Sequence, residues 1–218
     1  MEKKVILIGG TPCVGKSFSA SSLSKEFGIP WFSTDSIREF MREIANPEEY
    51  PSLFYFLDKK PEDYLVKHSP IEVMEDQNKE SYDVWKGVKA WINTNYKWDS
   101  FIVEGVAVLP ELVARDFEGY KGIKAIFLFN QDKEKIREVI YKRGLWAKSE
   151  EYSDDIKEKE VEWVLAFNDW LKKEVKRCGF LAIESEGGVF DIKKLADLVE
   201  AETDGRQVCQ KRQDRQFM

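Results

Sequence analysis

The chain has 218 residues, a length that suits a single domain. Hydrophobic residues make up 43% of it, which is enough for a full core and argues against a disordered protein. The formal net charge is −6 and no basic stripe stands out, so a surface that wraps nucleic acid is disfavoured. An anionic ligand would therefore have to be held by a few well-placed cations.

The cysteines and the first apolar run bear on the compartment. Cys13, Cys178 and Cys209 are odd in number and widely spaced, which predicts neither a disulfide framework nor a zinc site. The apolar run at residues 5–8 is too short for a signal-peptide core or a membrane span. We therefore expect a protein of the reducing cytoplasm, with no membrane partner.

Five short apolar runs predict strands, at residues 5–8, 29–32, 101–103, 123–129 and 180–183. Each has the length and the β-branched or aromatic content of a buried strand. The runs do not alternate between polar and apolar residues, and this favours a parallel sheet covered on both faces.

The stretches between these runs predict helices, at residues 17–27, 36–45, 71–98, 132–142, 154–177 and 191–201. In the first of them, Ala20, Leu23 and Phe27 share one face and Gly28 is the stop. Alternating strands and helices predict right-handed crossovers and a doubly wound sheet. We expect one α/β domain over residues 1–201, followed by a polar tail over 202–218 that is loose or binds a partner.

A glycine-rich loop joins the first strand to the first helix. Residues 10–17 read GTPCVGKS and match the phosphate-binding pattern G-x-x-x-x-G-K-[ST] in its required strand–loop–helix context. The glycines let successive backbone N–H groups point at phosphate oxygens, and the helix adds its positive end. Lys16 would reach the β- and γ-phosphates, and Ser17 would offer an oxygen to Mg²⁺. The predicted nucleotide-binding set is Gly10, Thr11, Pro12, Cys13, Val14, Gly15, Lys16, Ser17 and Phe18, of which Phe18 is interpreted as a packing residue.

Other residues narrow the class of nucleotide-binding protein. The sequence has no N-K-x-D motif, which a guanine-specific GTPase would use, and no paired Asp-Glu after residues 101–103, as a motor ATPase would have. A small-molecule kinase fits better, because Asp35, Arg38 and Arg42 follow the second predicted strand at helical spacing. The arginines could hold an anionic acceptor while Asp35 orients its hydroxyl. The alternatives are that Asp35 caps the helix and that the arginines lie on a solvated face.

Two more candidates complete the predicted site. Glu104 ends the third predicted strand beside the loop, where it could hold a magnesium-bound water or act as a base, since an unpaired buried carboxylate is costly. Arg143 precedes Gly144, at the start of a polar segment over 143–153 that could close as a lid and stabilise charge on the moving phosphoryl group. The alternative for Arg143 is an ordinary surface residue. Trp163, Phe167 and Trp170 are expected to form a core stripe.

At this point the motifs form a recognisable pattern. The sequence resembles the archaeal-type 2-phosphoglycerate kinase family of P-loop kinases, through ILIGGTPCVGKS, STDSIREFMR and IVEGVAVLP. Weaker support comes from Gln77, from the stretch 84–92 and from IKAIFLF, so that the resemblance spans roughly residues 3–185. The chain departs from the family at Phe18, where Thr is usual, and at residues 52–55, which read SLFY where Ser-Ser-Tyr is expected.

The resemblance implies an adenylate-kinase-like fold with strand order 2-3-1-4-5, a helical acceptor insert over about 36–98 and a short lid. It also implies ATP- and Mg²⁺-dependent phosphorylation of 2-phosphoglycerate to 2,3-bisphosphoglycerate. Lys16 and Ser17 would take the nucleotide and metal roles, Asp35 and Arg38 the acceptor roles, and Glu104 the role of the third-strand acid. Two alternatives stay open: a nucleoside or nucleotide monophosphate kinase, and a regulatory P-loop protein that hydrolyses ATP slowly. The preferred base, the acceptor and the oligomeric state are left open as well.

Overall fold

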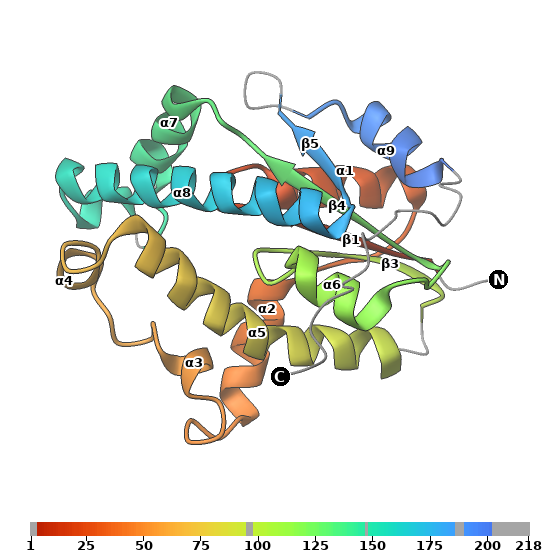
Figure 1. Ribbon diagram of the computed structural model, residues 1–218, viewed down its shortest axis with the longest axis horizontal. Helices are drawn as coiled ribbons and strands as arrows, with labels where there is room; N and C mark the ends of the chain where they lie inside the picture. The colour runs from red at the N-terminus through yellow and green to blue at the C-terminus, as the bar shows by residue number, and fades with distance from the viewer. Residues whose placement is uncertain (1–3, 95–97, 147, 186–189, 202–218) are drawn as a thin grey trace, which may run out of the picture.

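The computed structural model describes residues 4–94, 98–146, 148–185 and 190–201. Its centre is a five-stranded parallel sheet of β1 (Lys4–Gly10), β2 (Trp31–Ser33), β3 (Ser100–Glu104), β4 (Ile123–Phe129) and β5 (Leu181–Glu184). The strand order β2-β3-β1-β4-β5 confirms the expected doubly wound α/β fold (Figure 1). The predicted tail over 202–218 lies outside the described residues, and the division into one domain and a tail stays a prediction.

Helices cover both faces of this sheet. On one face lie α1 (Lys16–Phe27) and α9 (Ile192–Glu200), and on the other lie α2 (Thr34–Ile44), α5 (Pro70–Thr94), α6 (Pro110–Phe117) and α8 (Asp154–Cys178) (Figure 1). In β1, Ile6 and Ile8 pack toward the first face while Val5 and Leu7 pack toward the second. All four are fully buried, which explains why the strand reads as an unbroken apolar run.

Several elements differ from the sequence-based expectation. The strand β2 begins at Trp31, two residues late, because Ile29 N–H bonds Ser24 O at the end of α1 and Pro30 has no N–H to give to the sheet. The helix α2 begins at Thr34, earlier than expected, and α5 is described over Pro70–Thr94, while residues 95–97 of the helix expected over 71–98 lie outside the described residues. The remaining helices are α7 (Lys133–Arg143) and four short elements that were not predicted: α3 (Pro51–Phe54), α4 (Pro61–Leu65), α6 and the 3₁₀ turn η1 (Ser149–Glu151).

The loop after β3 packs tightly against the start of α2. Gly105 has φ +149°, and a Cβ atom at this position would lie 1.7 Å from Thr34 Oγ1. Only glycine fits there, because both the dihedral angle and the close approach exclude a side chain. This contact sets the end of β3, with Glu104, beside the first turn of α2, with Asp35. Within the described residues, no helix combines the length and apolar character that a membrane crossing needs.

Candidate active site

The glycine-rich loop curls between β1 and α1 as the motif requires. Gly10 and Gly15 have φ +154° and +92°, and Gly15 is the left-handed residue that precedes α1. Cys13 has φ +62°, a conformation that no other non-glycine residue adopts in the described part of the chain. Left-handed backbone at a residue with a Cβ is strained and persists where the surrounding structure enforces it. The loop therefore keeps a fixed curl, which preorganises its N–H groups.

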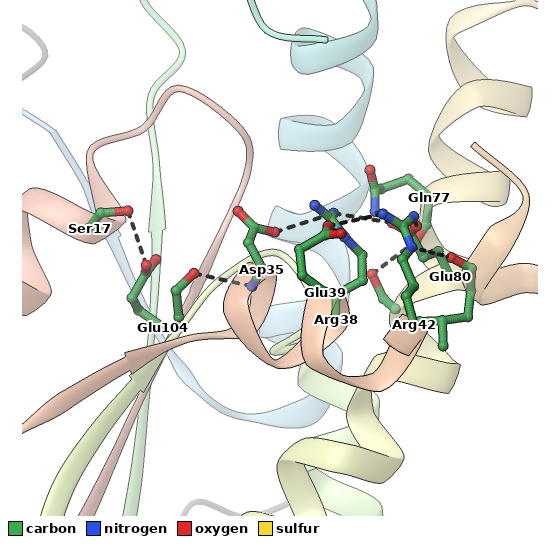
Figure 2. Close-up of polar contacts among 11 residues, drawn as sticks. Ser17, Asp35, Arg38, Glu39, Arg42, Gln77, Glu80 and Glu104 are labelled. Carbon is green, nitrogen blue, oxygen red and sulfur yellow. Dashed lines mark hydrogen bonds and ion pairs between the residues drawn. The ribbon is translucent and has the colours of Figure 1, made fainter. Parts of the chain in front are cut away.

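Lys16 and Ser17 lie at the start of α1, where Lys16 bonds the glycine-rich loop and Ser17 bonds the end of β3. Lys16 is buried, and its Nζ donates to the Thr11 carbonyl at 2.6 Å. Burial lowers the pKa of its ammonium group, and the nearby carboxylates of Glu104 and Asp35 oppose that shift. Ser17 Oγ donates to Glu104 Oε1 at 3.0 Å (Figure 2). Burial raises the pKa of the Glu104 carboxyl, and Lys16 opposes the shift.

The Ser17–Glu104 pair fits a magnesium site. A hydroxyl oxygen and a carboxylate oxygen 3.0 Å apart are the hard ligands that Mg²⁺ prefers, and they lie directly beside the loop that would carry the phosphates. Glu104 is almost fully buried in the protein but keeps this oxygen on the loop side. These two side chains could therefore hold Mg²⁺ together with its waters.

The sequence analysis did not identify the residues outside the glycine-rich loop that hold Thr11 in place by hydrogen bonds. Thr11 Oγ1 donates to Asn168 Oδ1 on α8 at 3.0 Å, and Asn168 Nδ2 donates to the carbonyl of Asn130, after β4, at 2.7 Å. Thr11 and Asn168 are buried, so both hydrogen bonds are shielded from water. A signal for Asn168 existed in the sequence, because it is an amide in the apolar face of a long helix.

Asp35 lies in the first turn of α2, with a largely exposed side chain that pairs with Arg38. The N-cap of α2 is Ser33, whose hydroxyl accepts the Asp35 N–H at 3.1 Å, so Asp35 does not serve as the cap. Its side chain is 63% exposed, and one carboxylate oxygen lies 3.4 Å from Arg38 Nη1. Figure 2 shows the Asp35 carboxylate between the Ser17–Glu104 pair and the arginines of α2. It is thus placed to meet a group that lies between the loop and α2.

The two arginines differ in how many of their guanidinium nitrogens already donate to oxygens of the protein. Arg42 Nε donates to Leu53 O, and its two other nitrogens donate to Glu39 and to Glu80, at 2.7–2.9 Å. Its side chain is only 11% exposed, so Arg42 ties α2 to α3 and α5. Arg38 donates to Glu39 at 2.9 Å and lies 3.5 Å from Glu80 Oε2, and its remaining charge faces Asp35 (Figure 2).

Glu80 on α5 is the buried centre of this cluster and was also missed. It is 2% exposed, accepts from Arg42, and accepts from Gln77 Nε2 at 3.1 Å. Burial raises the pKa of its carboxyl, and the guanidinium groups of Arg38 and Arg42 oppose the shift. An acid 38 residues from Arg42 in the chain gives no local sequence signal.

Arg143, the last residue of α7, reaches the glycine-rich loop. Its Nη2 lies 3.4 Å from Cys13 Sγ. The segment after it is held from α8 by Glu160, which is fully buried and accepts from the Trp146 N–H at 2.9 Å and from the Tyr152 hydroxyl at 2.7 Å. The described part of the expected lid over 143–153 is therefore tied down next to the loop.

One cavity of about 920 Å³ joins these groups. A volume of this size is at the upper end of the range for a bound cofactor, roughly 300–1,000 Å³. The predicted site residues that line it are Pro12, Cys13, Lys16, Ser17, Asp35, Arg38, Arg42, Glu104 and Arg143. Further lining residues that were not predicted include Phe56, Lys59, Lys60, Gln77, Glu80, Trp146, Lys148, Glu151 and Trp163.

The cavity lining is cationic in a chain that is acidic overall. It includes seven lysines and arginines against four aspartates and glutamates, an excess of three positive charges, whereas the whole chain carries −6. Low-dielectric walls strengthen the attraction of such a cleft for anions. The cavity is therefore suited to phosphorylated ligands.

The other predicted nucleotide-binding residues do not line this cavity; they are Gly10, Thr11, Val14, Gly15 and Phe18. Thr11 and Val14 are buried, and Val14 belongs to the core beneath α1. The packing role assigned to Phe18 is wrong, because its side chain is 65% exposed. The buried face of α1 is formed instead by Ala20 and Leu23, which point to the sheet. Trp163 is buried as expected, but it also lines the cavity.

Sequence comparison finds relatives among the 2-phosphoglycerate kinases. The chain is 30% identical over 150 residues to "2-phosphoglycerate kinase" of Methanopyrus kandleri, a match that covers 66% of this chain and 44% of the relative. It is 29% identical over 187 residues to the protein of the same name from Pyrococcus horikoshii, covering 83% of this chain and 59% of the relative. The matches thus span about half the length of these relatives, and no protein-family model matches the chain.

Solved structures share the fold at low sequence identity. A gluconokinase from Sinorhizobium meliloti 1021 superposes with a TM-score of 0.51 at 11% identity, over 90% of this chain and 89% of that one. TT1252 from Thermus thermophilus superposes with a TM-score of 0.52 at 18% identity, over 93% and 99%. By its strand order and its phosphate-binding loop the chain has the P-loop kinase fold, and in sequence it is similar to the 2-phosphoglycerate kinases over about half of their length.

Proposed function

We propose that this protein is an ATP-dependent small-molecule kinase. It transfers the γ-phosphoryl group of Mg·ATP to a hydroxyl of a small anionic acceptor. The observation that carries the proposal is that Lys16 and Ser17 of the phosphate-binding loop line the same cavity as Asp35 and Arg38. A protein that only binds or hydrolyses nucleotide has no need for the second pair.

Different residues act on the two ligands, the nucleotide and the acceptor. Lys16 exchanges its bond to the Thr11 carbonyl for oxygens of the β- and γ-phosphates, and Arg143 approaches the phosphates from the end of α7. Ser17 and Glu104 would hold Mg²⁺, which would supply charge neutralisation on the polyphosphate. Asp35 orients the acceptor hydroxyl and accepts its proton as the new O–P bond forms and ADP leaves.

The acceptor that best matches the relatives is 2-phosphoglycerate, with 2,3-bisphosphoglycerate as the product. Support comes from the names of the Methanopyrus kandleri and Pyrococcus horikoshii proteins and from the cationic excess of the cavity. Much of the catalysis would come from positioning and from charge stabilisation, since the transferred phosphoryl group spreads its charge over its oxygens.

A nucleoside or nucleotide monophosphate kinase is the second candidate. The observation that favours it is that Phe56, Trp146 and Trp163 also line the cavity, since aromatic rings can stack on a base. In this reading the acceptor would present a base to these rings and its sugar or phosphate hydroxyl to Asp35.

A phosphoryl-transfer screen tests the proposal. Purified protein with ATP and Mg²⁺ is offered 2-phosphoglycerate, glycerate, nucleosides and nucleoside monophosphates, and ADP and phosphorylated products are quantified. Product formation with 2-phosphoglycerate supports the favoured acceptor, and product formation with a nucleoside or nucleotide supports the second candidate. ATP hydrolysis that no acceptor stimulates would point instead to a regulatory ATPase. The variant Lys16→Ala serves as the inactive reference in each arm.

A further inference from the structure

The arginines of α2 have little charge left for an acceptor anion. Every nitrogen of the Arg42 guanidinium already donates to a protein oxygen, and Arg38 is surrounded by Glu39, Glu80 and Asp35. Two guanidinium groups thus face three carboxylates. An acceptor that carries a phosphate or a carboxylate needs compensating charge from another part of the cavity.

Two lysines provide such charge from the segment between α3 and α4. Lys59 and Lys60 line the cavity, and within the described residues neither has a carboxylate at ion-pair distance. The Lys59 ammonium lies 3.7 Å from the centroid of the Tyr55 ring, a contact that positions the group but leaves its charge unneutralised. By contrast Lys79 and Lys86, on the neighbouring α5, are each paired with an aspartate.

The backbone that carries the two lysines is anchored by the helix α4 that directly follows it. Pro61, directly after Lys60, and Leu65 are buried, and the Tyr64 hydroxyl donates to Asp76 Oδ2 on α5 at 2.5 Å. The Tyr64 ring also packs against Trp146, with ring centroids 5.3 Å apart, which links this segment to the one after α7. A fixed backbone reduces the entropy lost when the lysines close on a ligand.

We propose that Lys59 and Lys60 bind the anionic group of the acceptor and make the site select charged alcohols over neutral ones. The ligand chemistry is an oxyanion, either a phosphate ester or a carboxylate, on a small hydroxyl compound. The hydroxyl to be phosphorylated would lie beside Asp35 and Arg38, which line the same cavity. This inference rests on the proposed kinase function and names the chemical class of the acceptor.

Equilibrium binding tests the inference without requiring catalysis. The full chain, loaded with Mg²⁺ and a non-hydrolysable ATP analogue, is titrated calorimetrically with 2-phosphoglycerate, glycerol 2-phosphate, glycerate and glycerol. These four probes carry both anionic groups, phosphate only, carboxylate only and neither. We expect the double variant Lys59→Gln/Lys60→Gln to bind 2-phosphoglycerate roughly tenfold or more weakly, as expected for lost charge-assisted hydrogen bonds. Glycerol 2-phosphate and glycerate each carry one anionic group. The one whose affinity falls in the double variant together with that of 2-phosphoglycerate identifies the group that the lysines bind.

Control variants separate charge from structure. Lys59→Arg/Lys60→Arg keeps the charges and should retain most of the affinity, while Lys67→Gln removes an exposed lysine of the same insert that does not line the cavity and should change nothing. Thermal melts check that each variant folds. Unchanged 2-phosphoglycerate affinity in the folded double variant would overturn the inference, as would wild-type protein that binds none of the anions.

The two proposals can fail separately. Phosphoryl transfer by the wild type together with an unaffected double variant removes only the lysine site. Anion binding that depends on the lysines, without transfer to any acceptor, removes the kinase function and leaves the lysine site standing.

Discussion

The substitution Asn168→Ala should both destabilise the fold and weaken nucleotide binding. The Asn168 amide bridges the glycine-rich loop and the end of β4 through two buried hydrogen bonds, to Thr11 and to the Asn130 carbonyl. Alanine leaves the Thr11 hydroxyl and the Asn130 carbonyl buried without this partner, at about 1–2 kcal/mol each, which gives a total loss of about 2–4 kcal/mol. For a chain of this length each kcal/mol shifts the melting temperature by roughly 2–4 °C, so the midpoint should fall by roughly 4–16 °C.

Differential scanning calorimetry measures this shift, and nucleotide titration measures the effect on the loop. Because the Thr11 backbone would lose its tie to α8, we expect ATP to bind several-fold more weakly as well. The matched control is Asp169→Ala, at the exposed neighbouring position of the same helix. If Asn168→Ala melted within 1 °C or so of this control, the argument that the amide anchors the loop would be refuted.

Three further predictions concern the cavity. Lys16→Ala should abolish phosphoryl transfer while leaving the melting temperature nearly unchanged; measurable transfer by this variant would contradict the role of Lys16. Arg38→Ala should raise the KM for the acceptor more than the KM for ATP, since Arg38 lies beside Asp35 and away from the loop, and steady-state kinetics with each substrate varied would expose the opposite ranking. Burial raises the pKa of Glu104, so kcat should fall on the acid side at a pH above the ordinary titration range of a glutamate, and Glu104→Gln should remove that limb. Between the ordinary and the raised pKa the folded state binds more protons than the unfolded state, so this group's contribution to stability should fall as pH rises, and calorimetry against pH should show that dependence in the wild type but not in Glu104→Gln.

Part of the site could be predicted because its residues are close in the chain. The glycine-rich loop is contiguous, and Asp35 and Arg38 directly follow a strand whose end must lie at the same sheet edge. The prediction for Phe18 was wrong for a related reason: the residue after Ser17 belongs to the exposed face of α1, because the helix turns Ala20 and Leu23 toward the sheet.

Other parts could not be predicted because they depend on how α5 and α8 pack. Nothing near Arg42 indicates that Glu80 will neutralise it, and nothing near Thr11 indicates a partner 157 residues later in the chain. The lysines at 59 and 60 look like ordinary surface residues in the sequence. Their position at the cavity follows from the anchoring of α4 against α5 and the segment after α7.

The sequence by itself determined the strands, the phosphate-binding loop and the acids and arginine that follow β2 and β3, because unbroken apolar runs, glycines and local spacing act through neighbouring backbone. The strand order was expected from the family resemblance and is confirmed by the structure. The tertiary structure alone decided which charged side chains remain available to bind a ligand. Arg42 is paired with Glu80 between two helices, whereas Lys59 and Lys60, which line the same cavity, have no ion-pair partner among the described residues. The physical reason is that electrostatic interactions depend on distance in space and on burial, and both are set only when distant segments pack together.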